Sequence, residues 1–291
     1  MTDKTNATND DRGGCYIGGC VLNCAAHLPS VFANIRAMSS AFSECTIIIA
    51  YDESTDDSLA ILRGFVSQFP RMTILINSKP LSRMRTENIA NARNSILGEI
   101  NRQELGRQEL VYKYFIMMDM DDVCASPINT SVLLRYLGAG EVDRWDSLSF
   151  NRPGYYDIWA LSLDPYLISC WHWDPNPVPP SLFGSCEVTT IMGKYVIDRL
   201  AALRDDELLE CYSAFNGFAI YKLSHFSECS YNHNVLSSLK LIPSQLIQQN
   251  MAVLGRLFNM YYIEDCEHRY FHFQAIVSRQ ARIRISPCRL F

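Results

Sequence analysis

An apolar stretch that ends in a cluster of carboxylates most limits how this chain can fold. Residues 114–118 read as a buried strand, and Asp119, Asp121 and Asp122 follow almost at once. Because side chains alternate along a strand, we expect Asp119 and Asp121 on one side, with Cα atoms about 6.6 Å apart. Two carboxylates this close repel each other unless a cation or a proton lies between them, and hard oxygen ligands suit Mg²⁺ or Mn²⁺. The pattern is compatible with a metal site at a strand end or with a solvated acidic turn.

The composition indicates a folded core and argues against several function classes. Of the 291 residues, 48% are hydrophobic and 20% are charged, which favours a sizeable core over wholesale disorder. The net charge of -5 argues against nucleic acid as a partner. The 11 cysteines include no Cys-x-x-Cys pair, so structural zinc is not expected. The absence of an apolar leader or of a long apolar run predicts no membrane span, and with the cysteine usage it favours the cytoplasm.

Strand and helix patterns alternate along the first half of the chain. We expect strands at residues 15–23, 46–50, 72–77 and 114–118, and helices at 28–42, 59–66, from 82 to about 107, and 129–137. This order predicts an α/β fold with a mostly parallel sheet and helices on both faces. Residues 1–13 are polar and turn-rich and are expected to form a flexible tail.

Two arginines fall on one side of the helix that precedes the acidic strand. Arg85 and Arg93 are eight positions apart, which is about two helical turns. Their guanidiniums are suited to contact a diphosphate or to orient the carboxylates of the following strand. The alternative is a solvated helix face with local pairing to Glu87. The spacing by itself leaves both interpretations open.

Six blocks of polar and aromatic residues follow one another along the chain, at residues 52–58, 85–94, 118–122, 155–161, 215–222 and 265–268. In this order they resemble the nucleotide-sugar-dependent glycosyltransferases of the GT-A fold. More narrowly, they resemble the branch with fungal capsular mannosyltransferase-like proteins and glycosyltransferases of large DNA viruses and bacteria, and a viral member would be expected in the host cytoplasm. The chain departs from the family pattern at residues 162–190 and at residues 223–258, and the second range looks like an insertion. The resemblance implies a Rossmann-like GT-A catalytic domain over residues 14–291, with a nucleotide-sugar-binding half at about 14–125 and an acceptor-binding half at about 126–291.

The same resemblance implies roles for individual residues. Asp52 would contact the base or ribose of the nucleotide, since a carboxylate accepts hydrogen bonds from a uracil N–H or a ribose hydroxyl. Asp119 and Asp121 would hold the Mn²⁺ or Mg²⁺ that bridges the donor diphosphate, with His268 as the third ligand. The residues expected around the donor are Asp52, Arg85, Arg93, Asn94, Asp119, Asn216 and Gly217.

Two carboxylates are candidates for the catalytic base of an inverting reaction, Asp157 and Glu267, and the sequence leaves the choice open. Asp157 lies between Tyr156 and Trp159, aromatic residues suited either to lie against sugar rings or to pack in the core. The function that we expect is a metal-dependent hexosyl- or pentosyltransferase. It would move a monosaccharide from a UDP- or GDP-sugar to a hydroxyl of a glycan acceptor. The alternatives are a nucleotidyltransferase that makes sugar nucleotides and a non-catalytic glycan-binding protein with a GT-A fold.

Overall fold

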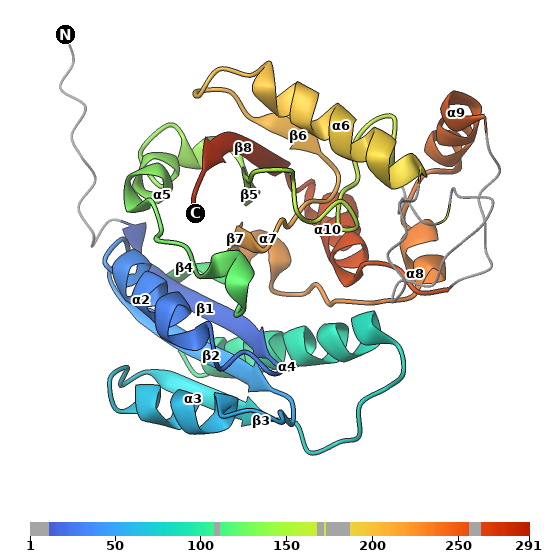
Figure 1. Ribbon diagram of the computed structural model, residues 1–291. Helices are drawn as coiled ribbons and strands as arrows, with labels where there is room; N and C mark the ends of the chain where they lie inside the picture. Colours follow the sequence, from blue (N-terminus) through green and yellow to red (C-terminus); the bar gives the residue numbers. More distant parts are fainter. Residues whose placement is uncertain (1–11, 108–110, 168–171, 173–186, 256–262) are drawn as a thin grey trace, which may run out of the picture.

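A single eight-stranded sheet runs through the computed structural model of the chain (Figure 1). The structure describes residues 12–107, 111–167, 172, 187–255 and 263–291. The strand order is β3-β2-β1-β4-β7-β5-β8-β6. Residues 1–11 of the expected tail and most of residues 162–190 lie outside the described residues. Across the described ranges, no helix is both long and apolar enough to cross a membrane.

The first half of the chain forms the parallel part of the sheet, as predicted. The strands are β1 (Gly14–Val21), β2 (Cys45–Tyr51), β3 (Met72–Ile76) and β4 (Tyr112–Asp119). The helices between them are α2 (Leu28–Ser39), α3 (Ser58–Val66) and α4 (Arg85–Leu105). β1 pairs in parallel with both β2 and β4, and β2 pairs in parallel with β3. The carboxyl ends of these strands therefore meet at one edge of the sheet.

The second half extends the same sheet with shorter strands. They are β5 (Ser147–Asn151), β6 (Leu209–Cys211), β7 (Phe218–Lys222) and β8 (Ile283–Arg289). The helical segments are η1 (Asp122–Cys124), α5 (Thr130–Tyr136), η2 (Val142–Arg144), α6 (Glu187–Ala201), α7 (Leu223–Phe226), α8 (Val235–Leu239), α9 (Ser244–Leu254) and α10 (Glu267–Arg279). β7 runs antiparallel to both β4 and β5, and β5 pairs in parallel with β8. The sheet is thus mixed but mostly parallel, and the α/β prediction is confirmed.

The alternation of side chains along β4 decides which layer each of its residues joins. Phe115 and Met117 pack into the core shared with α4 and α10, whereas Ile116 and Met118 pack into the core shared with α2 and α5. Helices therefore cover both faces of the sheet, as expected from the strand–helix order (Figure 1). Asp119 continues the alternation, which turns its side chain toward the α4 and α10 face.

Candidate active site

A cavity of about 470 Å³ lies at the carboxyl ends of β1, β2 and β4. The N-terminal half of α4, the first turn of α10 and the loop after β5 complete its walls. It brings together most of the residues singled out from the sequence. Its lining includes Asp52, Arg85, Arg93, Asp119, Asp121, Asp157, Glu267 and His268. The cavity thus lies where open α/β sheets bind their ligands, beyond the carboxyl ends of the strands.

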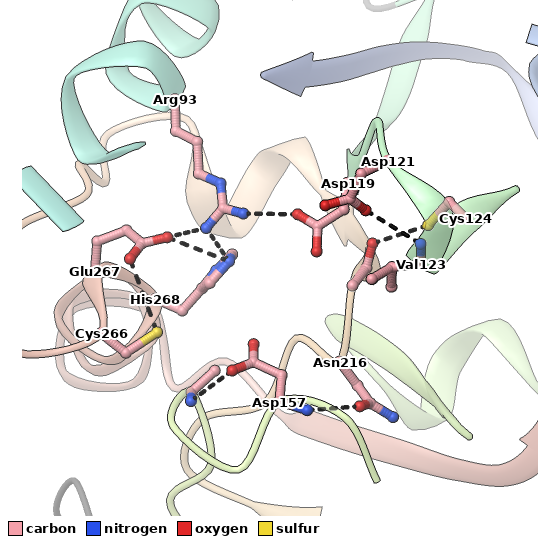
Figure 2. Close-up of polar contacts among 12 residues, drawn as sticks. Arg93, Asp119, Asp121, Val123, Cys124, Asp157, Asn216, Cys266, Glu267 and His268 are labelled. Carbon is pink, nitrogen blue, oxygen red and sulfur yellow. Dashed lines mark hydrogen bonds and ion pairs between the residues drawn. The ribbon is translucent and has the colours of Figure 1, made fainter. Parts of the chain in front are cut away.

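Asp119 is held at the floor of the cavity by an ion pair with α4. Its Oδ1 lies 3.3 Å from Arg93 Nη2 on α4 (Figure 2). Burial raises the pKa of Asp119 to about 7, and Arg93 opposes this shift. Nearby carboxylates, Asp121 first among them, raise it further. Arg93 therefore offsets only part of the rise in the pKa of Asp119 that burial and the nearby carboxylates cause.

Arg93 connects β4 to α10 through a buried guanidinium. Its Nη1 contacts both Glu267 Oε1 and His268 Nε2 in the first turn of α10 (Figure 2). The guanidinium carbon lies 4.5 Å from the centre of the Phe215 ring and 5.7 Å from that of Tyr231. Aromatic faces attract a cation at such distances, and more strongly where water is excluded. Arg93 is therefore fixed by aromatic contacts as well as by its ion pairs.

His268 faces this arginine rather than the two aspartates. Its Nε2 accepts from the guanidinium, which places the ring proton on Nδ1, an atom with no hydrogen-bond partner in the described part of the chain. Burial holds the pKa of His268 well below its ordinary value, and Arg93 lowers it further, so the ring is neutral. His268 lines the cavity, but its Nε2 contacts Arg93 and does not face Asp119 and Asp121 as a third metal ligand would.

Asp121 lies just beyond β4 and shapes the turn that follows. Its Oδ1 accepts the Val123 N–H at 3.1 Å and caps η1 (Figure 2). Beneath this turn, the carbonyl of Gly217 accepts the Asp119 N–H at 2.9 Å. Gly217 has φ +83°, and a Cβ atom there would overlap Cγ1 of Val123. A glycine is required because the turn of residues 216–217 passes directly under the acidic turn.

Asn216, Gly217 and Asn94 do not line the cavity, which differs from their expected place beside the donor. The Asn216 amide accepts the Asp157 N–H at 3.1 Å and donates to the Phe150 carbonyl at 2.8 Å. Asn94 donates to the Tyr231 carbonyl at 2.9 Å and accepts the Tyr231 N–H at 2.8 Å. The helical rotation of about 100° per residue carries Asn94 away from the direction of Arg93. These amides brace the backbone around the site.

Asp157 enters the cavity from the loop after β5. Burial raises its pKa to about 6, and a hydrogen bond from the Ala160 N–H, at 3.1 Å from Oδ1, works in the opposite direction. Glu267 raises the pKa of Asp157 further. A carboxylate with this pKa is ionised near neutral pH and remains basic enough to take a proton.

Asp52 lies between the first cavity and a second one that adjoins it. Asp52 Oδ1 accepts from the Asn77 side chain at 2.7 Å. The second cavity, of about 580 Å³, shares Asp52, Ser82, Asn88 and Ala92 with the first. Arg85 is the first residue of α4, and its exposed guanidinium forms no ion pair with any described residue. The carboxylate of Asp52 therefore lies where the two cavities meet, and the cation of Arg85 lies on the wall of the first cavity.

The acidic cluster meets some of the requirements of a divalent-cation site. Among the described residues, no three His, Cys, Asp or Glu side chains are grouped so as to hold a metal ion. Asp119 and Asp121 nevertheless place hard oxygen atoms in one cavity, and the charge of Asp121 adds to burial in raising the pKa of Asp119. The donor set fits Mg²⁺ or Mn²⁺ if further oxygen ligands come from a bound phosphate or from water.

The sequence does not predict the two aromatic residues that enclose Arg93, Phe215 and Tyr231. Phe215 lies in the block of residues 215–222, but there the sequence points only to the turn after it. Tyr231 lies in the segment expected to be an insertion, yet its ring stacks on Phe271 at 4.2 Å between ring centres and helps enclose Arg93. Its contact with Asn94 joins residues 137 positions apart. No local pattern near Tyr231 indicates such a contact.

Comparison with known proteins gives matches to solved structures alone. No protein-family model and no curated protein matches the chain. The crystal structure of TarS residues 1–349 from S. aureus is 12% identical, with a TM-score of 0.48 over 95% of this chain and 59% of that one. The UDP-GlcNAc complex of the same fragment is 14% identical, with a TM-score of 0.41 over 75% of this chain and 48% of that one. The chain therefore spans about half to three fifths of the length of these two structures.

A third solved structure is the mannosyltransferase PcManGT from Pyrobaculum calidifontis in complex with GDP-Man and Mn²⁺. It is 10% identical, with a TM-score of 0.41 over 95% of this chain and 73% of that one. Likenesses this distant do not decide what the present chain does. Its function has to be argued from its own cavity, and the narrower resemblance to fungal and viral proteins stays a prediction.

Proposed function

We propose that this protein is a metal-dependent GT-A glycosyltransferase that moves a monosaccharide from a UDP- or GDP-sugar to a hydroxyl of a glycan acceptor. One observation carries the proposal. A single cavity at the carboxyl ends of parallel strands holds a nucleotide-side carboxylate, Asp52, an acidic pair, Asp119 and Asp121, and a separate carboxylate of raised pKa, Asp157. Donor binding, charge neutralisation and proton acceptance each have a distinct residue there.

Asp119 and Asp121 are the proposed metal ligands. A bound divalent cation would stabilise the negative charge that develops on the leaving nucleoside diphosphate. His268 stays the proposed third ligand, although it would have to exchange its contact with Arg93 for the metal. The excess of carboxylates over buried arginine around Asp119 supports this assignment, because a cation would relieve their mutual repulsion.

Asp157 is the better supported of the two candidate bases. Glu267 is held in an ion pair with Arg93, whereas the Asp157 carboxylate accepts a single backbone N–H and faces the cavity. Asp157 would accept the proton of the acceptor hydroxyl as its oxygen forms a bond to the anomeric carbon. The bond from that carbon to the diphosphate oxygen breaks, and its electron pair leaves with the nucleoside diphosphate. This sequence describes an inverting transfer.

The donor itself would lie across both cavities. Asp52 is placed to accept hydrogen bonds from a base N–H or a ribose hydroxyl, and the Asn77 amide on its Oδ1 holds it in that orientation. Arg85 is free to contact the diphosphate because no described carboxylate pairs with it. Arg93 would brace Asp119 and would not touch the donor, since its guanidinium is already surrounded.

The test is donor hydrolysis followed by NMR. The purified protein is incubated with a panel of UDP- and GDP-sugars, with Mn²⁺ or with EDTA. We expect slow Mn²⁺-dependent release of the nucleoside diphosphate from one donor. In a separate incubation with a nucleoside triphosphate and a sugar phosphate, release of pyrophosphate would instead favour the nucleotidyltransferase. A protein that neither hydrolyses a donor nor shows donor-induced shifts in its spectrum would contradict the transferase assignment and leave the glycan-binding function.

A further inference from the structure

A buried ion pair behind the cavity joins α10 to the loop that carries Asp157. The side chains of Asp265 and Arg269 are both 0% exposed, and Arg269 Nε donates to Asp265 Oδ2 at 2.9 Å. Asp265 precedes α10, and its Oδ1 accepts the Cys266 N–H at 2.8 Å. Removing two charges from water is costly unless the remaining donors of the arginine also find partners.

Those remaining donors all reach one short stretch of backbone after Asp157. Nη2 of Arg269 donates to the Trp159 carbonyl at 2.6 Å. Nη1 donates to the Leu161 carbonyl at 2.9 Å and contacts the hydroxyl of Ser162. One guanidinium therefore fixes three successive points of this loop relative to α10.

The peptide group between Trp159 and Ala160 links Arg269 to Asp157. Its carbonyl accepts from Arg269, and its N–H donates to Asp157 Oδ1 at 3.1 Å. In a trans peptide these two groups point in opposite directions, so a cation on the carbonyl side fixes the direction of the N–H. Hydrogen bonds arranged in a chain also polarise one another, which strengthens the bond to the carboxylate.

We infer that Arg269 is a positioning residue that holds Asp157 in its orientation in the active site through the Trp159–Ala160 peptide. This inference rests on the proposed function, in which Asp157 is the base. An N–H that donates to the ionised carboxylate favours the ionised form. The peptide therefore keeps the pKa of Asp157 lower than burial by itself would leave it. Losing the Arg269 contact weakens that donor and raises the pKa of Asp157.

Other groups near Asp157 stay the same in the test. The charged or titratable groups that act on Asp157, or are acted on by it, are Glu267 and Cys266 at the start of α10, Arg85 and Arg93 on α4, Asp119 at the end of β4, and Tyr155 and Tyr156 on its own loop. A substitution at Arg269 replaces none of these side chains, and Arg269→Lys keeps the positive charge that acts on Cys266.

The experiment is Arg269→Lys, which keeps a positive charge beside Asp265 but lacks the planar fork that reaches three acceptors. The Asp157 carboxyl is titrated by NMR in protein with ¹³C-labelled aspartate, and its signal is assigned by its loss in Asp157→Asn. We expect the Asp157 titration to move upward by about one pH unit. In the hydrolysis assay, the acidic limb of kcat/KM should move in the same direction. We expect kcat to fall about tenfold and the KM for the donor to change less than about twofold.

Arg282→Lys is the matched control. Arg282 Nε donates to the buried Asp146 at 2.9 Å, and its Nη1 reaches the Asp143 carbonyl, so it forms the same kind of contact away from the cavity. It should lower stability without moving the Asp157 titration. If Arg269→Lys does not fold, the double change Asp265→Asn with Arg269→Gln replaces the ion pair by a neutral pair, and the same upward movement is expected.

The two proposals fail in different ways. A folded Arg269 variant whose Asp157 carboxyl titrates as in the wild type overturns the inference about Arg269. A wild-type protein that neither hydrolyses nor binds any donor overturns the proposed function, and with it the role of Asp157 as a base. The NMR titration needs no turnover, so it reports on the link between Arg269 and Asp157 in either case.

Discussion

Replacing Asp157 by asparagine should stabilise the protein at pH 8 while it removes turnover. Burial raises the pKa of Asp157 from its ordinary 3.8 to about 6. Between these two values the folded state binds more protons than the unfolded state, so the contribution of this group to stability falls as the pH rises. Each unit of this pKa difference corresponds to about 1.4 kcal/mol, so above pH 6 the ionised Asp157 lowers the free energy of unfolding by about 3 kcal/mol.

Asparagine avoids this loss because it does not ionise. It is close to aspartate in shape, and its side-chain oxygen can still accept the Ala160 N–H. Asp157 is only partly buried, so water screens part of its charge. We therefore expect a gain of about 1–3 kcal/mol at pH 8 and little difference at pH 4. The measurement is urea unfolding of the metal-free protein at both pH values.

Asp146→Asn is the control with the opposite sign. Burial opposes ionisation of Asp146, but hydrogen bonds from Arg282 and Lys222 hold its pKa well below the ordinary value. A lowered pKa contributes stability that is present above the unfolded pKa and is lost as the pH falls. Asp146→Asn should therefore destabilise the protein at pH 8. If Asp157→Asn lowers stability at pH 8 in the same way, the argument from burial of Asp157 is refuted.

Three further substitutions test the metal site and the residues around it. Asp121→Ala should lower Mn²⁺-dependent turnover by about 10²–10³; full activity of this variant in EDTA would exclude a metal role for Asp121. Gly217→Ala combines φ +83° with an overlap on Val123, and we expect a loss of about 2–3 kcal/mol in urea unfolding; a neutral effect would show that the turn has room to move. Asn94→Ala removes two hydrogen bonds to the Tyr231 backbone and should cost about 2 kcal/mol of stability. Its donor Kd, measured by calorimetry, should change less than about twofold, and a large weakening would return Asn94 to the donor site.

The parallel half of the sheet was predictable because each of its elements has a strong local signal. Apolar runs of the length of β2 and β4 alternate with helices whose apolar faces repeat every three or four residues. The second half lacks such signals. β6 has three residues, and β8 inserts between β5 and β6, so its place depends on partners far away in the sequence. Contacts of that kind leave no local pattern.

The residues of the site also fall into those that have a local signal in the sequence and those that have none. Asp119, Asp121 and Arg93 were predicted because strand alternation and helical spacing are local rules, and the structure brings all three to one cavity. Asn94 and Asn216 were expected beside the donor because of the family resemblance, but their amides contact backbone groups that the sequence does not identify. Arg269 was missed because its acceptors lie about 110 positions earlier in the chain.

The surroundings of Arg93 support the proposal that a divalent cation binds in this cavity together with the donor. The guanidinium already contacts Asp119, Glu267 and His268, and two aromatic rings hold it in place. It therefore cannot move to neutralise Asp121 or Asp157 when an anionic diphosphate arrives. Arg85 can approach the diphosphate, but it is exposed, and solvent weakens its attraction. A donor that enters without a divalent cation would add negative charge beside carboxylates that already repel one another. Donor affinity should for this reason depend on the metal more strongly than on either arginine.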